Sequence, residues 1–217
     1  MFSYAKCRDG MIIPERFEMA KKSQEKTVGS VPRVIIIRGT PGTGKSTIAQ
    51  KVASLLKGTT KKAYIPIDNV QHLDLRNGSK DKFKLGIFHT AILCRSFIQE
   101  GFNIVVDYVF DADLDFFIEK LFRSHATTLP PCKVQVFYID AEFETIKKRN
   151  KARRDPMPLP ILKKLYETCN AQKGSFPGEV VIDSTKLSPK GSAKIILDSS
   201  AAIVGCKKDG TLRLGEL

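Results

Sequence analysis

The sequence predicts an α/β fold in which a parallel sheet is covered by helices on both faces. Short apolar runs alternate with longer helical patterns from residue 33 onward, which is typical of a buried parallel sheet in a three-layer sandwich. A glycine-rich loop also joins the first apolar run directly to the first helical pattern. In open sheets of this kind, ligands bind beyond the carboxyl ends of the strands.

The first expected strand, residues 33–38, leads into GTPGTGKS, Gly39 to Ser46. This segment fits the phosphate-binding pattern G-x-x-x-x-G-K-[ST], and it lies between a strand and a helix as that pattern requires. Its glycines permit a tight turn and bring backbone N–H groups close to phosphate oxygens. A glycine-rich turn that binds nothing is the alternative, but every position and both flanks match. The fold is therefore expected to be that of a P-loop NTPase, which binds a nucleoside triphosphate and Mg²⁺. The expected nucleotide-binding residues are Gly39, Thr40, Pro41, Gly42, Thr43, Gly44, Lys45, Ser46 and Thr47.

The remaining elements continue the alternation of strands and helices. A helix over about 45–57 has one apolar stripe and ends at Gly58, and a short strand over 63–68 follows it. The other expected strands are 102–107, 134–139 and 180–182. Three further helices are expected over about 82–100, 114–122 and 159–172. Asp140 is expected to cap a helix that follows it, and Ser188-Pro189 to open the last helix.

Composition sets the limits of the domain. We expect an N-terminal extension over 1–30, a P-loop domain over 31–204, and a tail or short extra strand over 205–217. No apolar stretch approaches the roughly 18 residues that a membrane helix needs, and the N-terminus has no apolar core of signal-peptide length. The five cysteines are odd in number and scattered. The sequence therefore predicts a cytoplasmic protein with no membrane insertion and no disulfide framework.

The net charge is high and positive. Lysine and arginine number 36 against 23 acidic residues, which gives a formal charge of +13. A field of this sign favours anionic partners such as nucleotides, nucleic acids or acidic membrane surfaces. Surplus lysines that merely solvate the surface are the alternative. Charge alone does not choose a substrate.

The carboxyl ends of the strands hold the residues expected to carry chemistry. P-loop kinases have the strand order 2-3-1-4-5, and Pro66 fits an edge position for strand two because proline cannot donate to a ladder. Strand two delivers Asp68, strand three delivers Asp107, and strand five delivers 183–185. Phosphoryl transfer needs a phosphate cradle, Mg²⁺, a group that orients the attacking hydroxyl, and cations over the migrating phosphoryl group.

Two aspartates fit two of these roles. Asp107 follows an apolar strand beside the loop, so that we expect it to bind Mg²⁺ together with the Ser46 hydroxyl; capping of the next turn is the alternative. Asp68 is expected on the acceptor side, as the base or orienting group for the attacking hydroxyl. The start of an Asx-turn with Asn69 is its alternative role.

The densest charge cluster is 147–154, in which six of eight residues are basic. A solvated helix face is the common explanation for such a run. This one, however, ends a helix after strand four and precedes Asp155-Pro156, where nucleotide kinases carry a mobile lid. Arg149 and Arg153 are four residues apart, and their guanidinium groups suit the oxygens of a transferring phosphoryl group. We therefore expect an arginine-bearing lid.

Several segments resemble one group of enzymes. KRNKARRDPMPLPILKKLY, Lys148 to Tyr166, is similar to the lid of the P-loop kinases related to polynucleotide 5′-hydroxyl kinase, a group that includes zeta-toxin-like and chloramphenicol-phosphotransferase-like enzymes. IPIDNVQH resembles the acceptor motif D-D-x-R, NIVVD the strand-three motif, and VVIDSTKLSP the segment near the adenine. The resemblance covers about 33–203. It implies ATP as the phosphate donor, Lys45 and Asp68 as catalytic residues, Arg153 as the principal lid arginine and Arg149 as its companion.

One position departs from the pattern of that group. The arginine of D-D-x-R, which holds a phosphate of the acceptor, falls at Gln71, and the second aspartate falls at Asn69. Arg76 and Lys80 lie near enough in sequence to be candidates for the missing cation.

The expected function is transfer of the γ-phosphate of ATP to an acceptor hydroxyl. An anionic acceptor, with the 5′-hydroxyl of a polynucleotide or nucleotide as one candidate, is favoured by the lid and the +13 charge. A small-molecule or nucleotide-sugar kinase on the same scaffold is favoured by Gln71. A non-kinase NTP-binding switch ranks last, because a switch needs neither an acceptor-side aspartate nor a double-arginine lid. The sequence does not indicate an oligomeric state.

Overall fold

The computed structural model describes residues 31–56, 61–74, 80–123 and 129–200, with 204–206 and 212–214. The expected extension over 1–30 lies outside the described residues, as do Arg76 and the side chain of Lys80.

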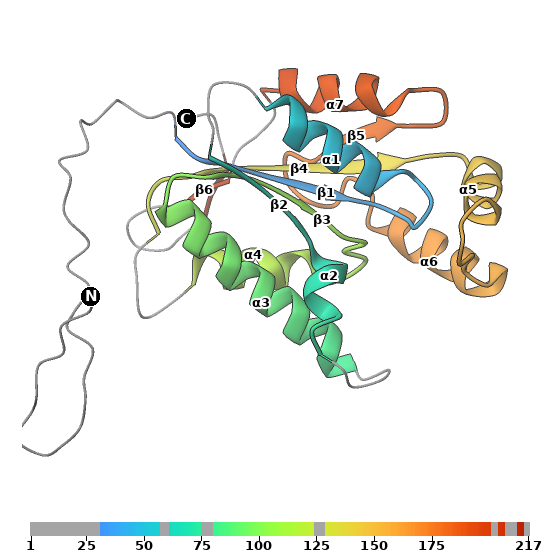
Figure 1. Cartoon of the computed structure of the whole chain (residues 1–217), viewed down its shortest axis with the longest axis horizontal. Helices are drawn as coiled ribbons and strands as arrows, with labels where there is room; N and C mark the ends of the chain where they lie inside the picture. The colour runs from blue at the N-terminus through green and yellow to red at the C-terminus, as the bar shows by residue number, and fades with distance from the viewer. Residues whose placement is uncertain are drawn as a thin grey trace, which may run out of the picture. The chain divides into compact units, whose positions relative to one another are not determined.

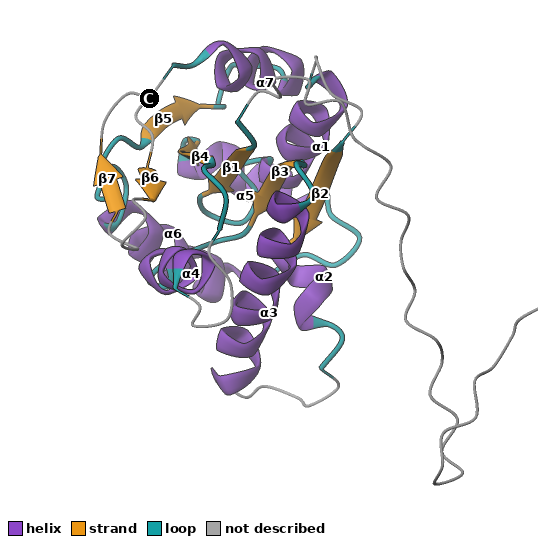
Figure 2. Cartoon of the chain, turned by 90° about the vertical axis from the view of Figure 1, so that its left-hand side faces the viewer, coloured by secondary structure: helices purple, strands orange, loops and turns teal. Residues whose placement is uncertain are grey.

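Five parallel strands form the centre of the molecule. They are β1 (Arg33–Arg38), β2 (Lys62–Pro66), β3 (Asn103–Asp107), β4 (Lys133–Asp140) and β5 (Val180–Asp183). Their order is β2-β3-β1-β4-β5, which confirms the predicted order 2-3-1-4-5 and is seen end-on in Figure 2. Among the described residues, β2 pairs only with β3, so that Pro66 ends an edge strand as expected.

Two short strands extend this sheet near the C-terminus. β6 (Val204–Cys206) pairs antiparallel with β4 at Val134, and β7 (Leu212–Leu214) pairs antiparallel with β6. The segment 205–217 was expected to be either a tail or a short extra strand, and part of it does form strand.

Helices cover both faces of the sheet, as Figure 1 shows. The helices are α1 (Lys45–Leu55), α2 (Ile67–Gln71), α3 (Lys80–Gln99), α4 (Leu114–Phe122), α5 (Phe143–Lys151), α6 (Leu159–Ala171) and α7 (Pro189–Asp198). α1 and α7 lie on one face, and α3 and α4 lie on the other, while α5 and α6 lie beyond the carboxyl end of β4. The three-layer α/β fold of a P-loop NTPase is thus confirmed.

The alternation of side chains along β1 explains the two cores. Ile35 and Ile37 pack with residues of α1 and α7, whereas Val34 and Ile36 pack with residues of α3 and α4, and all four are fully buried. Successive side chains of a strand point to opposite faces, so that a continuous apolar run serves both layers. No helix among the described residues is long and apolar enough to cross a membrane.

Two boundaries differ from the sequence-based expectation. β2 ends at Pro66, where its partner β3 ends at Asp107, and the chain turns at once into α2, so that Asp68 lies in a helix and not at the end of a strand. Asp140 was expected to cap the next helix, but α5 begins only at Phe143, after Glu142. The Asp140 carboxylate instead accepts a hydrogen bond from the Ala141 backbone N–H at 2.9 Å. The Ser188 cap is confirmed, because its Oγ accepts from the Gly191 N–H at 3.1 Å.

Candidate active site

The phosphate-binding loop connects β1 to α1 through backbone conformations that favour glycine. Gly39 has φ 138°, and Gly42 and Gly44 both have φ 93°, in the left-handed range that other residues rarely adopt. A Cβ atom at Gly39 would also collide with the Ile139 carbonyl oxygen of β4. The loop therefore depends on glycine for its shape as well as for access to its N–H groups.

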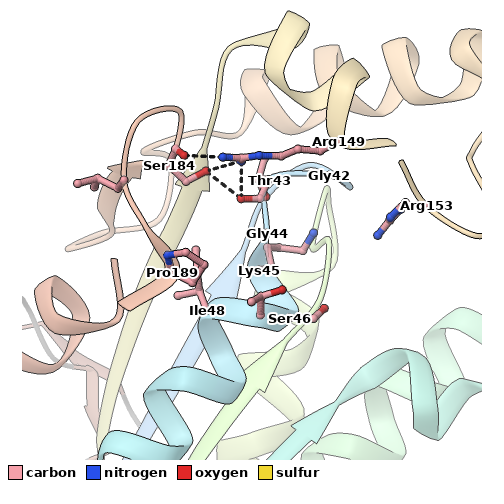
Figure 3. Close-up of a pocket in the computed structure, with 12 residues that line it drawn as sticks. Gly42, Thr43, Gly44, Lys45, Ser46, Ile48, Arg149, Arg153, Ser184 and Pro189 are labelled. Carbon is pink, nitrogen blue, oxygen red and sulfur yellow. Dashed lines mark hydrogen bonds between the residues drawn. The ribbon is translucent and has the colours of Figure 1, made fainter. Parts of the chain in front are cut away.

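A pocket of about 450 Å³ opens above this loop. It is lined by Gly42, Thr43, Gly44, Lys45, Ser46, Thr47, Ile48, Arg149, Arg153, Ser184, Leu187 and Pro189, most of which are labelled in Figure 3. Gly39, Thr40 and Pro41 are buried and do not line it. Six of the nine expected nucleotide-binding residues, Gly42 to Thr47, thus face one cavity together with Arg149 and Arg153, the two arginines expected in a lid.

Lys45 is the first residue of α1 and is only 8% exposed. Its Nζ donates to the Thr40 carbonyl oxygen, a member of its own loop, at 3.0 Å. Burial lowers the pKa of Lys45, and the neighbouring Asp107 carboxylate acts in the opposite direction. An ammonium group with one neutral partner in a buried site has capacity for an anionic ligand.

Asp107 joins three elements at the edge of the pocket. One of its carboxylate oxygens accepts from the Ser46 hydroxyl at 2.7 Å, and the other accepts from the Tyr64 hydroxyl of β2 at 2.8 Å. The side chain is 4% exposed. Asp107 does not cap the next turn, because the Ala112 N–H donates to the Asp111 carboxylate instead.

The Ser46 and Asp107 pair fits Mg²⁺. Both supply oxygen ligands next to the phosphate loop, and Mg²⁺ in nucleotide sites takes one or two protein oxygens and fills its other positions with phosphate and water. The described residues contain no cluster of three or more acidic, histidine or cysteine side chains that could hold a metal unaided. A metal shared with a nucleotide is therefore the arrangement that suits this donor set.

Asp68 lies in the first turn of α2, outside the pocket and exposed to solvent. Desolvation by the surrounding protein raises the pKa of its carboxyl group, and Lys45 is the strongest opposing influence. The charges of Asp68 and Lys45 therefore influence each other, although no hydrogen bond or ion pair joins the two side chains among the described contacts.

Arg149 of α5 is bound to the protein itself. Its guanidinium donates to the Thr43 carbonyl oxygen at 3.3 Å and to the Ser184 hydroxyl and carbonyl oxygens at 3.1 and 2.8 Å, as the dashed lines of Figure 3 show. The Ser184 hydroxyl in turn donates to the Thr43 carbonyl oxygen at 2.8 Å. Arg149 therefore joins the phosphate loop to the segment after β5 while it lines the pocket.

Arg153 differs from Arg149 in its surroundings. It is exposed, and its guanidinium forms no hydrogen bond or ion pair with the described residues, standing apart from the other sticks in Figure 3. The lid segment that carries it is closed by buried Asn150, whose side chain donates to the Met157 carbonyl oxygen at 2.9 Å and accepts from the Met157 N–H at 3.1 Å. Arg153 is thus an available cation on a short constrained loop.

Sequence reasoning left two contributors to this site, Tyr64 and Ser184, without a role of their own. Tyr64 lies on an edge strand far from the motif, and no local pattern marks it. Ser184 was placed at the end of strand five but given no role. Leu187 and Pro189 add an apolar wall, and they belong to VVIDSTKLSP, the segment that the sequence resemblance placed near the adenine.

Comparisons with known proteins bear on the fold. No protein-family model matches this sequence, and no curated protein is similar enough to match it. Among solved structures, a sugar kinase from Janibacter sp. HTCC2649 is 18% identical, with a TM-score of 0.55 over 77% of this chain and 93% of that one. The tunicamycin resistance protein of Deinococcus radiodurans is 16% identical, with a TM-score of 0.56 over 79% and 98%. The APS kinase of Mycobacterium tuberculosis, solved with AMPPNP and APS, is 16% identical, with a TM-score of 0.53 over 77% and 96%. At these identities the likeness shows the fold, which this chain shares with P-loop kinases.

Proposed function

We propose that this protein is an ATP-dependent phosphotransferase that moves the γ-phosphate to an acceptor hydroxyl. The observation that carries the proposal is the convergence of the phosphate loop and Arg153 on one pocket, which Ser46 lines while it donates a hydrogen bond to Asp107. These are the parts that phosphoryl transfer requires. A fold shared with several kinases supports the same reaction.

Different residues of the chain have different roles in the proposed transfer. The loop N–H groups and the Lys45 ammonium bind the β- and γ-phosphates and fix the direction of the terminal phosphorus. Arg153 offers its donors to the equatorial oxygens of the phosphoryl group, where charge accumulates during transfer. Asp68 accepts the proton of the attacking hydroxyl or holds that hydroxyl in line. Ser46 and Asp107 would hold Mg²⁺, which would supply positive charge against the phosphates.

The nucleoside half of ATP has a suitable place in the same pocket. Leu187 and Pro189 provide apolar surface beyond the phosphate loop, and Ser184 ties that segment to the loop through Arg149. An aromatic base gains more from such a wall than a phosphate does. This division supports a nucleotide donor in preference to a free phosphate or pyrophosphate.

Transfer of label from γ-labelled ATP tests the proposal. The purified protein is incubated with labelled ATP, Mg²⁺ and candidate acceptors that include nucleosides, sugars and 5′-hydroxyl oligonucleotides. Label is expected in at least one acceptor, at a rate well above that of release to water. ATP binding followed by release of label to water alone would favour the NTP-binding switch.

A further inference from the structure

We propose that the chain has a second ligand site, between α1 and α7, which binds a small carboxylate with an apolar body. The site is a cavity of about 720 Å³, within the range of about 300–1,000 Å³ that is usual for small-molecule sites. Its described lining combines leucine side chains with basic residues and consists of Arg33, Leu55, Leu56, Ser188, Lys190, Gly191, Lys194, Leu197 and Asp198.

The packing of two helices positions this cavity. α1 and α7 lie side by side on one face of the sheet, as Figure 1 shows. The leucines come from the C-terminal ends of these helices, and Arg33 is the first residue of β1. The phosphate loop lies before the opposite end of α1, at Lys45. The apolar part of the cavity is therefore separated from the phosphate-binding residues by the length of α1.

The segment that leads into α7 separates the two cavities. Leu187 and Pro189 line the pocket above the phosphate loop, whereas Ser188 and Lys190 line the second cavity. The Ser188 Oγ accepts from the Gly191 N–H at 3.1 Å, which fixes this turn. The two described linings share no residue. A ligand of the second cavity is therefore expected to bind without displacing ATP.

The leucines form a preformed apolar wall. Leu56 is buried, and Leu55 and Leu197 are half-buried. All three belong to or pack against the core between the sheet and these two helices, so that their positions are held by the fold. Covering the part of this wall that faces the cavity removes apolar surface from water, which favours a ligand with a hydrocarbon body.

Arg33 supplies the charge that selects the head group. Its Nε donates to the Gln135 side-chain oxygen at 2.9 Å, and its Nη2 donates to the same atom. Because the amide of Gln135 is neutral, this contact orients the guanidinium without cancelling its charge. Burial lowers the pKa of Arg33, and a charge in such poorly solvated surroundings attracts a carboxylate more strongly than it would in water.

The rim of the cavity adds further positive charge. Lys190 and Lys194 lie one turn apart on α7 and both line the cavity, and Asp198 follows one turn later. The described lining thus has three basic residues against one acidic residue, which favours an anion over a neutral or cationic amphiphile. A simple anion would leave the leucine wall in water, and a hydrocarbon would leave Arg33 without an anionic partner. A carboxylate with an apolar body satisfies both.

Titration of the whole chain with octanoate, followed by methyl NMR, tests the proposal. 1-Octanol has the same apolar body without the charge, and acetate has the carboxylate without the body. Octanoate is expected to bind at least tenfold more tightly than either, with its largest shifts at the methyl groups of Leu55, Leu56 and Leu197. Equal affinities for octanoate and 1-octanol, or for octanoate and acetate, would overturn the proposal.

Filling the cavity locates the site. A Cβ atom at Gly191 would make only ordinary contacts, the nearest with the Ser188 Oγ at 3.4 Å, so that Gly191→Phe extends a ring from the cavity wall. Ile195→Phe adds a ring to an exposed position of the same helix outside the described lining, and it is the control. Octanoate affinity is expected to fall at least tenfold in Gly191→Phe and to stay unchanged in Ile195→Phe. Equal affinities in the two folded variants would overturn the proposal.

Removing the charge of Arg33 tests the head group. Arg33→Gln is expected to lower the affinity for octanoate about tenfold and to leave that for 1-octanol unchanged. Lys163→Gln, on the exposed surface of α6, should change neither. Thermal melting checks that both variants are folded. Unchanged octanoate binding in folded Arg33→Gln would overturn the assignment of this cation.

Competition with ATP separates this site from the proposed phosphotransfer. Octanoate is expected to bind with the same affinity in the absence and in the presence of saturating ATP and Mg²⁺. Displacement by ATP would place octanoate in the nucleotide pocket and overturn the proposal. Failure of phosphate transfer to every acceptor would instead remove the proposed function and leave octanoate binding as it is.

Discussion

The cations around the phosphate loop differ in whether the protein already binds them. Among the described residues, Lys45 has a single neutral partner and Arg153 has none. Arg38, at the end of β1 immediately before the loop, is instead bound by Glu179 and two carbonyl oxygens. All three lie near the loop, but Arg38, unlike Lys45 and Arg153, is not available to a ligand.

This difference teaches that a basic residue near a phosphate loop is not by itself a phosphate ligand. A buried guanidinium that is fully hydrogen-bonded stabilises the fold, and its pairing with a buried carboxylate removes its net field. The overall charge of +13 carries no information on this point, because pairing is decided residue by residue.

The largest expected effect is that of Lys45→Ala. A cation that acts on the transferring phosphoryl group is typically worth about 10³–10⁵-fold in turnover, so that transfer is expected to fall by that order. The melting temperature without nucleotide should change little, because the only hydrogen-bond partner of Nζ among the described residues is the Thr40 carbonyl oxygen. Lys51→Ala, on an exposed position of the same helix, is the control. Similar single-turnover rates for the two variants would remove Lys45 from the donor side.

Asp68→Asn is expected to lower turnover by about 10²–10⁴-fold, the usual contribution of a general base, with little change in ATP affinity. Because desolvation raises the pKa of Asp68, and because a base must be deprotonated, wild-type turnover should fall as the pH drops through a value above the ordinary aspartate range. The variant should lack this acid limb. A pH profile of turnover checks both expectations, and parallel losses of rate and nucleotide affinity would instead assign Asp68 to the metal.

Glu179→Ala tests whether Arg38 is structural. Removing one partner of a buried ion pair leaves an uncompensated charge and typically costs about 3–5 kcal/mol. Urea unfolding should show a loss of that order for Glu179→Ala. Glu167→Ala removes an exposed carboxylate that lies 4.0 Å from Lys163, and it should cost under about 1 kcal/mol. If the two variants are equally stable, the buried ion pair of Arg38 with Glu179 does not stabilise the fold.

The lid arginines are expected to differ from each other. Arg153→Ala should lower turnover by about 10²–10³-fold with a smaller change in the Michaelis constant for ATP, since its contact forms mainly in the transition state. Arg149→Ala should also raise that constant and lower the melting temperature, because Arg149 holds Thr43 and Ser184. Lysine should restore neither, since it lacks the forked donor geometry.

Lys147→Ala is the control for the lid, because Lys147 pairs with Glu144 on the surface of α5. Equal single-turnover transfer rates in Arg153→Ala and Lys147→Ala would mean that the basic residues of 147–154 only solvate the surface.

The smallest effect is expected for Tyr64→Phe. The Tyr64 hydroxyl orients Asp107 at 2.8 Å, and one hydrogen bond is worth about 1 kcal/mol, or about fivefold. The Mg²⁺ concentration that gives half-maximal rate should therefore rise about fivefold while the rate at saturating Mg²⁺ stays close to that of the wild type. An unchanged Mg²⁺ dependence would mean that Ser46 alone positions Asp107.

Most of the fold could be predicted because its elements are marked by contiguous signals. Continuous apolar runs such as 34–37 are typical of strands that are buried on both faces. Ser188-Pro189 marks the start of a helix, because serine caps the helix and proline fits its first turn. The end of β2 could not be placed, because the length of a strand depends on its partner, and β3 ends opposite Pro66. For the same reason, Asp68 was expected at the end of a strand but lies in α2.

Within the candidate site, the proximity of the loop residues could be predicted, while their functional roles stay predictions. The residues of the phosphate loop follow one another in sequence, so that their proximity needs no knowledge of the fold. The contacts of Tyr64 with Asp107 and of Arg149 with Ser184 join separate elements across 43 and 35 positions, and no local pattern encodes them. Residue type alone also could not reveal that Arg38 and Gln71 are already engaged by Glu179 and Tyr108.

Titration with pyrophosphate and Mg²⁺ at physiological ionic strength tests most directly whether the pocket above the phosphate loop, with Lys45 and Arg153, is the phosphate-binding site. Calorimetry is expected to show one pyrophosphate site per chain, which saturating ATP removes completely and which Lys45→Ala abolishes. Glu167→Lys, a charge change on the exposed surface, should leave the titration unaltered. Pyrophosphate binding that persists in the ATP-saturated protein or in Lys45→Ala would contradict the assignment of phosphate binding to this pocket.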